Sequence, residues 1–187
     1  MRTSLLLLSL ALVATPALAK TKAGVTMPDE LEVAGHHLIL NGLGIREATM
    51  LKVDVYVAGL YVEAKSGDGN AISGNGTSKR LVMHFVRDVD RDDIAEAFSD
   101  GFEKVLGEDG AKKMEPRIKQ LVAATRDMKK GEKLSFSYVP DVGTTLDVNG
   151  KASAPIPGAD FAKAIFAIWL GKSPPNSGLK EGLLGKD

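Results

Sequence analysis

The sequence predicts a single α+β domain in which an antiparallel-rich sheet carries helices on one side, as an open-faced sandwich. Segments with alternating apolar residues form two groups along the chain, and two segments with helical periodicity separate these groups. Asn149-Gly150 directly follows an alternating segment and is the strongest hairpin signal in the chain, which favours antiparallel pairing.

The composition is that of one ordinary globular domain and excludes several classes of function. The chain has 187 residues, of which 44% are hydrophobic, and it contains no Cys. It therefore cannot be a disulfide scaffold, hold a Cys-ligated zinc or iron–sulfur site, or use a cysteine nucleophile. Its 24 basic residues balance 24 acidic ones and only 5% of the residues are aromatic, so no nucleic-acid partner is expected.

The beginning of the chain is predicted to be a signal peptide. Arg2 gives the positive start, residues 5–13 are an apolar run, and Ala17-Leu18-Ala19 has the small-x-small pattern of a cleavage site. The run is shorter than the roughly 20 residues that span a bilayer. We therefore expect cleavage after Ala19 and a periplasmic or secreted protein without a stable membrane anchor. The expected division of the chain is a signal peptide at 1–19, a polar leader at 20–29 and a single domain at 30–187.

Short strands are predicted on both sides of an Ala34-Gly35 turn, at residues 32–33 and 37–40. Residues 51–57 alternate between apolar and polar positions, which is typical of a half-buried strand. The apolar set changes parity at Gly59, which indicates a bulge or a strand covered on both faces. The next features, in order, are a Gly-, Asn- and Ser-rich loop at 66–78 and a strand at 79–86.

Two helices with apolar faces are predicted after these strands. The first is capped by Asp90 or Asp92 and ends at Gly107. The second carries its apolar face over residues 114–125 and ends at Gly131, and a proline within it indicates a late start or a bend. The remaining elements, in order, are strands at 134–138 and 144–148, an apolar helix at 159–170 and a short helix at 175–184.

No cofactor and no metal site is expected. The spacing that begins a calcium loop is present at Asp88, Asp90 and Asp92. This segment lacks the turn glycine and the bidentate acid of such a loop, so a solvated helix cap is the simpler interpretation. His36 and His37 are adjacent in a strand and point to opposite faces, so they cannot share a metal ion.

The informative segment is Gly42 to Glu63, which predicts a ligand site. Alternation places Gly42, Gly44 and Arg46 on one strand face, so bare backbone lies beside a long cation. A ligand lying across the sheet fits there, because Arg holds a carboxylate or a phenolate with two parallel hydrogen bonds. Tyr56 on the next strand adds a phenol as a further donor. The alternative is an Arg46 that pairs with an acid at the surface and a Tyr56 that belongs to the core.

Three stretches of the chain carry a family resemblance. They are Asn41-Gly42-Leu43-Gly44-Ile45-Arg46, Val53 to Glu63, and Phe161 to Gly185 with its Ile168-Trp169-Leu170-Gly171. They resemble the paired first strands and the closing helices of the chalcone isomerase family, in particular the bacterial members that carry export signals. The resemblance implies the chalcone isomerase-like fold over most of the chain after the signal peptide.

The same resemblance implies roles for individual residues. Plant chalcone isomerases orient a reacting oxyanion with an arginine that matches Arg46. Their second-strand threonine falls on Tyr56, however, and their helix tyrosine and asparagine fall near Arg91 and Phe98. In the fatty-acid-binding branch of the family an arginine and a tyrosine hold a carboxylate, and Arg46 with Tyr56 resembles that pair. The acyl chain would then run between the sheet and the predicted helices, at 94–105 and 161–170.

Three hypotheses about function follow. The favoured one is an exported, non-catalytic protein that binds a fatty acid or a similar amphipathic carboxylate through Arg46, Tyr56, Gly42 and Gly44. The second is an isomerase or lyase that acts on an enone-like substrate, with Arg46 as the electrostatic stabiliser. The third is a structural or interaction protein without a ligand.

Overall fold

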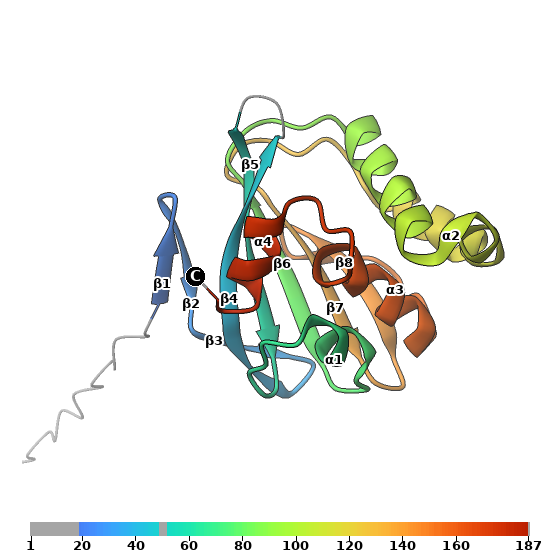
Figure 1. Cartoon of the computed structure of the whole chain (residues 1–187), viewed down its shortest axis with the longest axis horizontal. Helices are drawn as coiled ribbons and strands as arrows, with labels where there is room; N and C mark the ends of the chain where they lie inside the picture. The colour runs from blue at the N-terminus through green and yellow to red at the C-terminus, as the bar shows by residue number, and fades with distance from the viewer. Residues whose placement is uncertain (1–18, 49–51, 187) are drawn as a thin grey trace, which may run out of the picture.

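Seven strands form one antiparallel sheet in sequence order, which confirms the predicted α+β class (Figure 1). The structure is a computed structural model that describes residues 19–48 and 52–186. Most of the predicted signal peptide lies outside the described residues. The strands of the sheet are β3 (Glu30–Val33), β4 (His36–Ala48), β5 (Val53–Val62), β6 (Lys79–Phe85), β7 (Lys133–Val139), β8 (Gly143–Val148) and β9 (Lys151–Ala152).

Two-residue turns set the antiparallel order at two places. Ala34 and Gly35 have φ angles of 49° and 81°, and Asn149 and Gly150 have φ angles of 50° and 86°. Positive φ at both central residues defines the type I′ turn, whose twist matches that of the paired strands. Both turns predicted from the sequence are therefore confirmed, one between β3 and β4 and the other between β8 and β9.

The sheet buries side chains on both of its faces. On one face, the strands pack against helices through a row that includes Leu60, Leu81, Phe136 and Leu146. On the other face, β1 (Ala19–Lys22) and β2 (Val25–Pro28) form a hairpin whose Val25 and Met27 are only 6% and 3% exposed. The predicted polar leader is therefore a hairpin that contributes to the core, because its apolar residues alternate. Gly59 lies under this hairpin, so the interpretation of a strand covered on both faces is confirmed.

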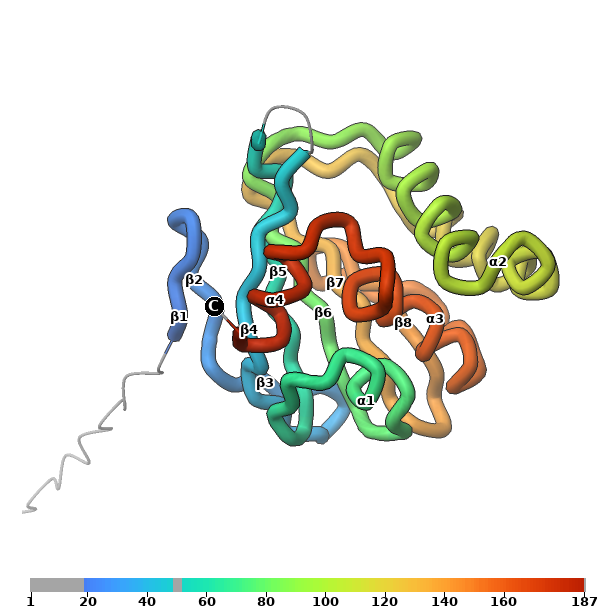
Figure 2. The backbone as a smooth tube through the Cα atoms, viewed as in Figure 1, coloured from blue at the N-terminus to red at the C-terminus, as the bar shows by residue number. Residues whose placement is uncertain are grey.

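The helices lie on one side of the sheet, as predicted (Figures 1 and 2). The helix α2 packs its Phe98 on Phe136 of the sheet, and its far half extends to one side beyond the strands. The predicted helices at 159–170 and 175–184 are confirmed. Within the part of the chain that the structure describes, no helix is long and apolar enough to cross a membrane. The helices are α1 (Gly69–Gly74), α2 (Arg91–Ala123), α3 (Ala159–Leu170) and α4 (Ser177–Leu183).

The predicted loop at 66–78 is wrong in part, because it contains the short helix α1. The side chain of Asp68 accepts hydrogen bonds from the backbone of Asn70 and Ala71 and so caps the helix. Ile72 is buried on the helix-facing side of the sheet and anchors the turn. A polar composition with one apolar residue gave no helical periodicity from which this element could have been predicted.

The helix α2 differs from the prediction in its second half. Gly107, with φ of 71°, ends the first helical half as predicted. The second half begins directly afterwards instead of near residue 114, and it ends at Ala123 instead of Gly131. The chain leaves the helix early because Val89 and Met128 pair as a β-bridge through two backbone hydrogen bonds of 2.8 and 2.9 Å.

Candidate functional site

A cavity of about 930 Å³ lies between the sheet, the first half of α2 and the connection from α3 to α4. Its size is in the range of small-molecule sites in proteins. Apolar side chains from β6, α2 and α3 form much of its wall, including Met83, Phe85, Ile94, Phe98, Ile168 and Trp169. The two helices that were predicted to lie beside an alkyl chain therefore both line the cavity.

A β-bulge brings Arg46 and Tyr56 to this cavity. The two residues are direct partners on β4 and β5, and the next pair joins Glu47 to Asp54, so Val55 has no partner. The extra residue turns Val55 toward the cavity beside Tyr56, and both line its wall together with Arg46. The structure thus brings together the cation and the phenol that were singled out from the sequence. The bulge in β5 lies at Val55 and not at Gly59.

The hydroxyl group of Tyr56 is buried and faces a fixed donor. Tyr56 is 9% exposed and packs edge-on against Phe85, with 5.6 Å between the ring centroids. The indole Nε1–H of Trp169 donates a hydrogen bond to Tyr56 Oη at 2.9 Å. Burial raises the pKa of Tyr56 to about 12, although the Trp169 hydrogen bond and the charge of Arg46 act in the opposite direction. Tyr56 is therefore a neutral phenol at neutral pH.

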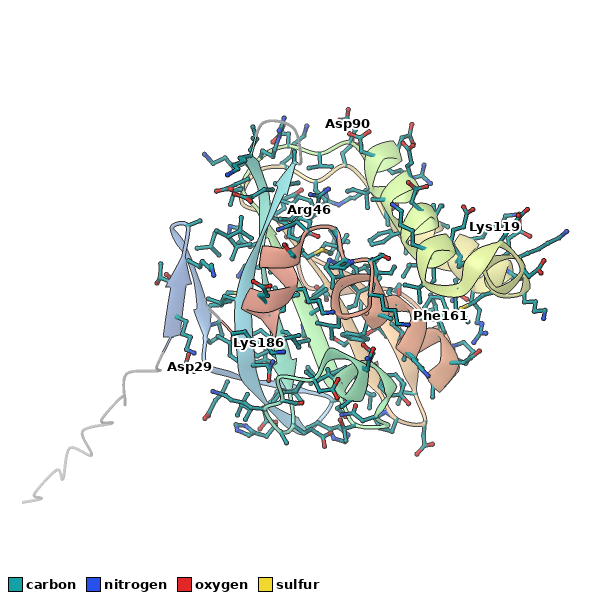
Figure 3. All side chains as sticks on the ribbon, viewed as in Figure 1. Asp29, Arg46, Asp90, Lys119, Phe161 and Lys186 are labelled. Carbon is teal, nitrogen blue, oxygen red and sulfur yellow. The ribbon has the colours of Figure 1, made fainter. Side chains whose placement is uncertain are left out.

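Arg46 is half-buried at the end of the sheet near the start of α2, where Asp90 is labelled (Figure 3). Its guanidinium group donates to the backbone carbonyl of Glu47. Among the residues that the structure describes, Arg46 makes no ion pair, whereas Tyr56 belongs to the buried core, as the alternative interpretation expected of it. Most of its donors remain available to a ligand in the cavity.

Charged side chains of both signs also line the cavity. The basic ones are Arg87 and Lys104, and the acidic ones are Asp88, Asp90, Asp93 and Asp100. Asp88 accepts from the backbone of Lys130 and pairs with Lys129 at 3.1 Å, and these contacts lower its pKa.

The aspartates of the calcium-like spacing do not converge on one point. The Asp92 side chain pairs with that of Arg91, and Asp90 stands at the N-cap of α2 without a side-chain capping bond. The side chain of Asp127, and not that of Asp90, accepts a hydrogen bond from the backbone N–H of Arg91. Within residues 19–48 and 52–186, no group of three or more metal-ligating side chains is present. His36 and His37 lie near two different carboxylates, those of Glu63 and Glu30.

The predicted ligand-binding role of Gly42 and Gly44 is wrong. Both glycines share the face of Arg46, but neither lines the cavity, because the backbone of α4 covers them. A methyl group at Gly42 would collide with the carbonyl groups of Gly182 and Leu183, and one at Gly44 would collide with that of Leu179. The bare backbone of β4 therefore accommodates a helix.

Several residues of the site were not predicted as members of it. Trp169 was part of a family resemblance only, and its contact with Tyr56 spans 113 positions of the chain. Phe85 and Met83 alternate along β6 with less buried residues, a pattern that marks a buried face but not a cavity. Of the two positions that align loosely with polar residues of plant chalcone isomerases, Phe98 lines the cavity and Arg91 does not.

Comparisons with known proteins agree with this architecture. A family model described as chalcone isomerase-like matches residues 19–185. The crystal structure of a fatty-acid binding protein of Arabidopsis thaliana superposes with a TM-score of 0.67 and 14% sequence identity, over 90% of this chain and 95% of that chain. No curated protein sequence matches. The structural likeness at this identity shows the fold, and the family match covers nearly all described residues. The chain therefore belongs to the chalcone isomerase-like family.

Proposed function

We propose that the protein is a non-catalytic binding protein for a fatty acid or a similar amphipathic carboxylate. The observation that carries this proposal is the cavity itself, in which the guanidinium of Arg46 and the phenol of Tyr56 adjoin a wall of apolar side chains. The carboxylate lies at Arg46 and Tyr56, and the alkyl chain extends between the sheet and the helices α2 and α3. The structural neighbour from Arabidopsis thaliana, described as a fatty-acid binding protein, supports the same class of ligand.

The energetics favour such a ligand over a purely apolar one. Removing a carboxylate from water is costly unless charge-assisted hydrogen bonds replace those to water. Arg46 can donate two and Tyr56 one, while each methylene group buried in the cavity contributes roughly 0.8 kcal/mol. The helix positions that match the polar contacts of plant isomerases carry Phe98, an apolar residue, and Arg91, which lies outside the cavity lining. This arrangement supports binding of an alkyl chain more than the positioning of a polar bicyclic substrate.

The experiment is solvent extraction and mass spectrometry of the purified protein, followed by calorimetric titration with decanoate. We expect an acyl carboxylate near one per chain in the wild type, and a decanoate affinity that falls at least tenfold in Arg46→Gln. Arg91→Gln is the matched control, because Arg91 directly follows Asp90 of the cavity lining but does not itself line the cavity. An equal affinity of the two variants would overturn the proposal, and Arg46-dependent turnover of a chalcone would support the isomerase instead.

We also propose that the protein is exported after cleavage behind Ala19. The support is the basic, apolar and small-residue pattern of residues 1–19. The family match begins at residue 19, next to the predicted cleavage site. N-terminal sequencing of the protein recovered outside the cytoplasm should begin at Lys20. A sequence that begins at Met1 would contradict export by this route.

A further inference from the structure

Trp169 makes the only hydrogen bond of the Tyr56 hydroxyl group among the described residues. Its indole Nε1–H donates to Tyr56 Oη at 2.9 Å, and both side chains are buried in the wall of the cavity. An indole N–H is a donor only, whereas a phenol oxygen accepts through its lone pairs and donates its one proton. Trp169 therefore uses an acceptor position of Tyr56 Oη and leaves the proton of Tyr56 without an acceptor.

The indole ring of Trp169 is held in place by its neighbours. It is 3% exposed, and it packs against Phe98 and Phe136 with 6.3 and 5.6 Å between ring centroids. These contacts come from α2 and β7, so the ring is fixed from two sides while α3 fixes its backbone. A rotation of the Trp169 ring that moved Nε1 away from Tyr56 would therefore disturb its packing against Phe98 and Phe136.

Arg46, the cross-strand partner of Tyr56, adds only further donors, because a guanidinium group has no acceptor. The polar end of the cavity at this pair therefore presents N–H and O–H groups to a ligand. A deprotonated carboxylate can accept two of these hydrogen bonds from Arg46 and one from Tyr56. An alcohol of the same chain length carries a proton of its own, for which Arg46 offers no acceptor and Tyr56 Oη offers only the position that Trp169 leaves unused.

We infer that Trp169 is a positioning residue: it makes the Tyr56 hydroxyl group a dedicated donor and thereby selects a carboxylate head over an alcohol head. This inference rests on the proposed function and adds to it the basis of head-group selectivity. Donation into Oη also polarises the O–H bond of Tyr56, which strengthens its own hydrogen bond to the ligand.

The test is a calorimetric double-mutant cycle with decanoate and 1-decanol as probes. The four proteins are the wild type, Trp169→Phe, Tyr56→Phe and the double variant, each checked for folding by circular dichroism. We expect the ratio of decanoate to decanol affinity to fall about tenfold in each single variant, as for the loss of about one hydrogen bond. In the double variant it should fall no further, because Trp169 acts through Tyr56.

The outcomes separate this inference from the proposed function. A wild type that does not bind decanoate would overturn both. If decanoate binds through Arg46, an equal loss of both ligands in Trp169→Phe, or a further loss in the double variant, would overturn only the role of Trp169. If Trp169→Phe does not fold, Tyr56→Phe is the deciding variant. It must lower the ratio of decanoate to decanol affinity, and it must shift the NMR signal of the Trp169 indole N–H. Failure of either result would contradict the inference.

Discussion

Tyr56 and Tyr61 lie on opposite faces of β5, and the pKa of each hydroxyl group is higher than its usual value. Burial raises the pKa of each to about 12, and the nearby Asp29 carboxylate adds to this shift at Tyr61. Tyr61 donates its proton to the carbonyl of Pro28 at 2.9 Å, so this phenol pins the β1–β2 hairpin to the sheet. In both residues the fold favours the neutral phenol over the phenolate.

Alkaline pH should therefore destabilise the protein through Tyr56. Since the folded pKa is higher than the unfolded value near 10, the stabilisation is complete below about pH 10 and is lost as the pH rises toward 12. The two units correspond to roughly 2–3 kcal/mol of unfolding free energy. Denaturant unfolding at several alkaline pH values should show a shallower decline for Tyr56→Phe than for the wild type. Parallel curves for the two proteins would contradict this assignment.

The sequence could predict the two polar residues of the site but not their surroundings. Arg46 and Tyr56 stand out because alternation within each strand is a local property that fixes the face of a side chain. The contact between Tyr56 and Trp169 depends on how α3 packs on the sheet, and nothing local encodes it. Gly42 and Gly44 were misinterpreted because bare backbone admits a ligand or another backbone equally well.

At the scale of elements, the closest packing joins β4 to α4. Gly44 faces the carbonyl group and side chain of Leu179, and Gly182 of the helix faces the backbone of Leu43 and Gly44 in return. Backbone meets backbone here, so an added methyl group cannot be accommodated by rotating a side chain. Overpacking of this kind typically costs about 1–3 kcal/mol.

We therefore expect Gly44→Ala to lower the unfolding free energy by about 1–3 kcal/mol, as measured by urea denaturation. The matched control is Gly178→Ala in the same helix, where an added methyl group meets only the Asn176 side chain at 3.8 Å. That variant should be neutral or up to about 1 kcal/mol more stable, because Ala is the better helix former. Equal effects of the two substitutions would show that close approach is not what requires Gly44.

Elements with strong local signals were predicted well, and those that depend on tertiary contacts were not. The apolar helix at 159–170 and the turn at Asn149-Gly150 have their signals within a few residues. The end of α2 is set by the pairing of Val89 with Met128, which lie 39 positions apart, so its helical pattern alone could not locate it. The sequence predicts a polar leader at 20–29 and not the hairpin found there, because only Val25 and Met27 of that hairpin are buried.

Across the whole molecule, one ion pair ties the far half of α2 to the helical layer. Arg117 donates to both carboxylate oxygens of Asp160 at 2.8 and 2.6 Å, and also to the carbonyl of Pro157. This bidentate contact lowers the pKa of Asp160 to about 2. The second half of α2 is thereby anchored at the start of α3.

Acidic pH should break the ion pair between Arg117 and Asp160. Because the pKa of Asp160 is lower in the folded state, the stabilisation is present above about pH 4 and is lost as the pH falls toward 2. Asp160 is partly exposed, so we expect Arg117→Gln to cost at most about 1 kcal/mol at neutral pH. The difference in thermal stability between the two proteins should vanish near pH 2. A difference that persists there would mean that Arg117 acts through its packing on Phe161.

The chain contains a single Trp, and that residue lies in the wall of the cavity. All indole emission of the protein therefore originates beside the proposed ligand. An alkyl chain that binds beside this buried ring should change its emission, and loss of tertiary structure, which exposes the ring to water, should shift the emission toward longer wavelengths. Trp169 fluorescence can therefore report both ligand binding in the cavity and unfolding of the protein, without any added label.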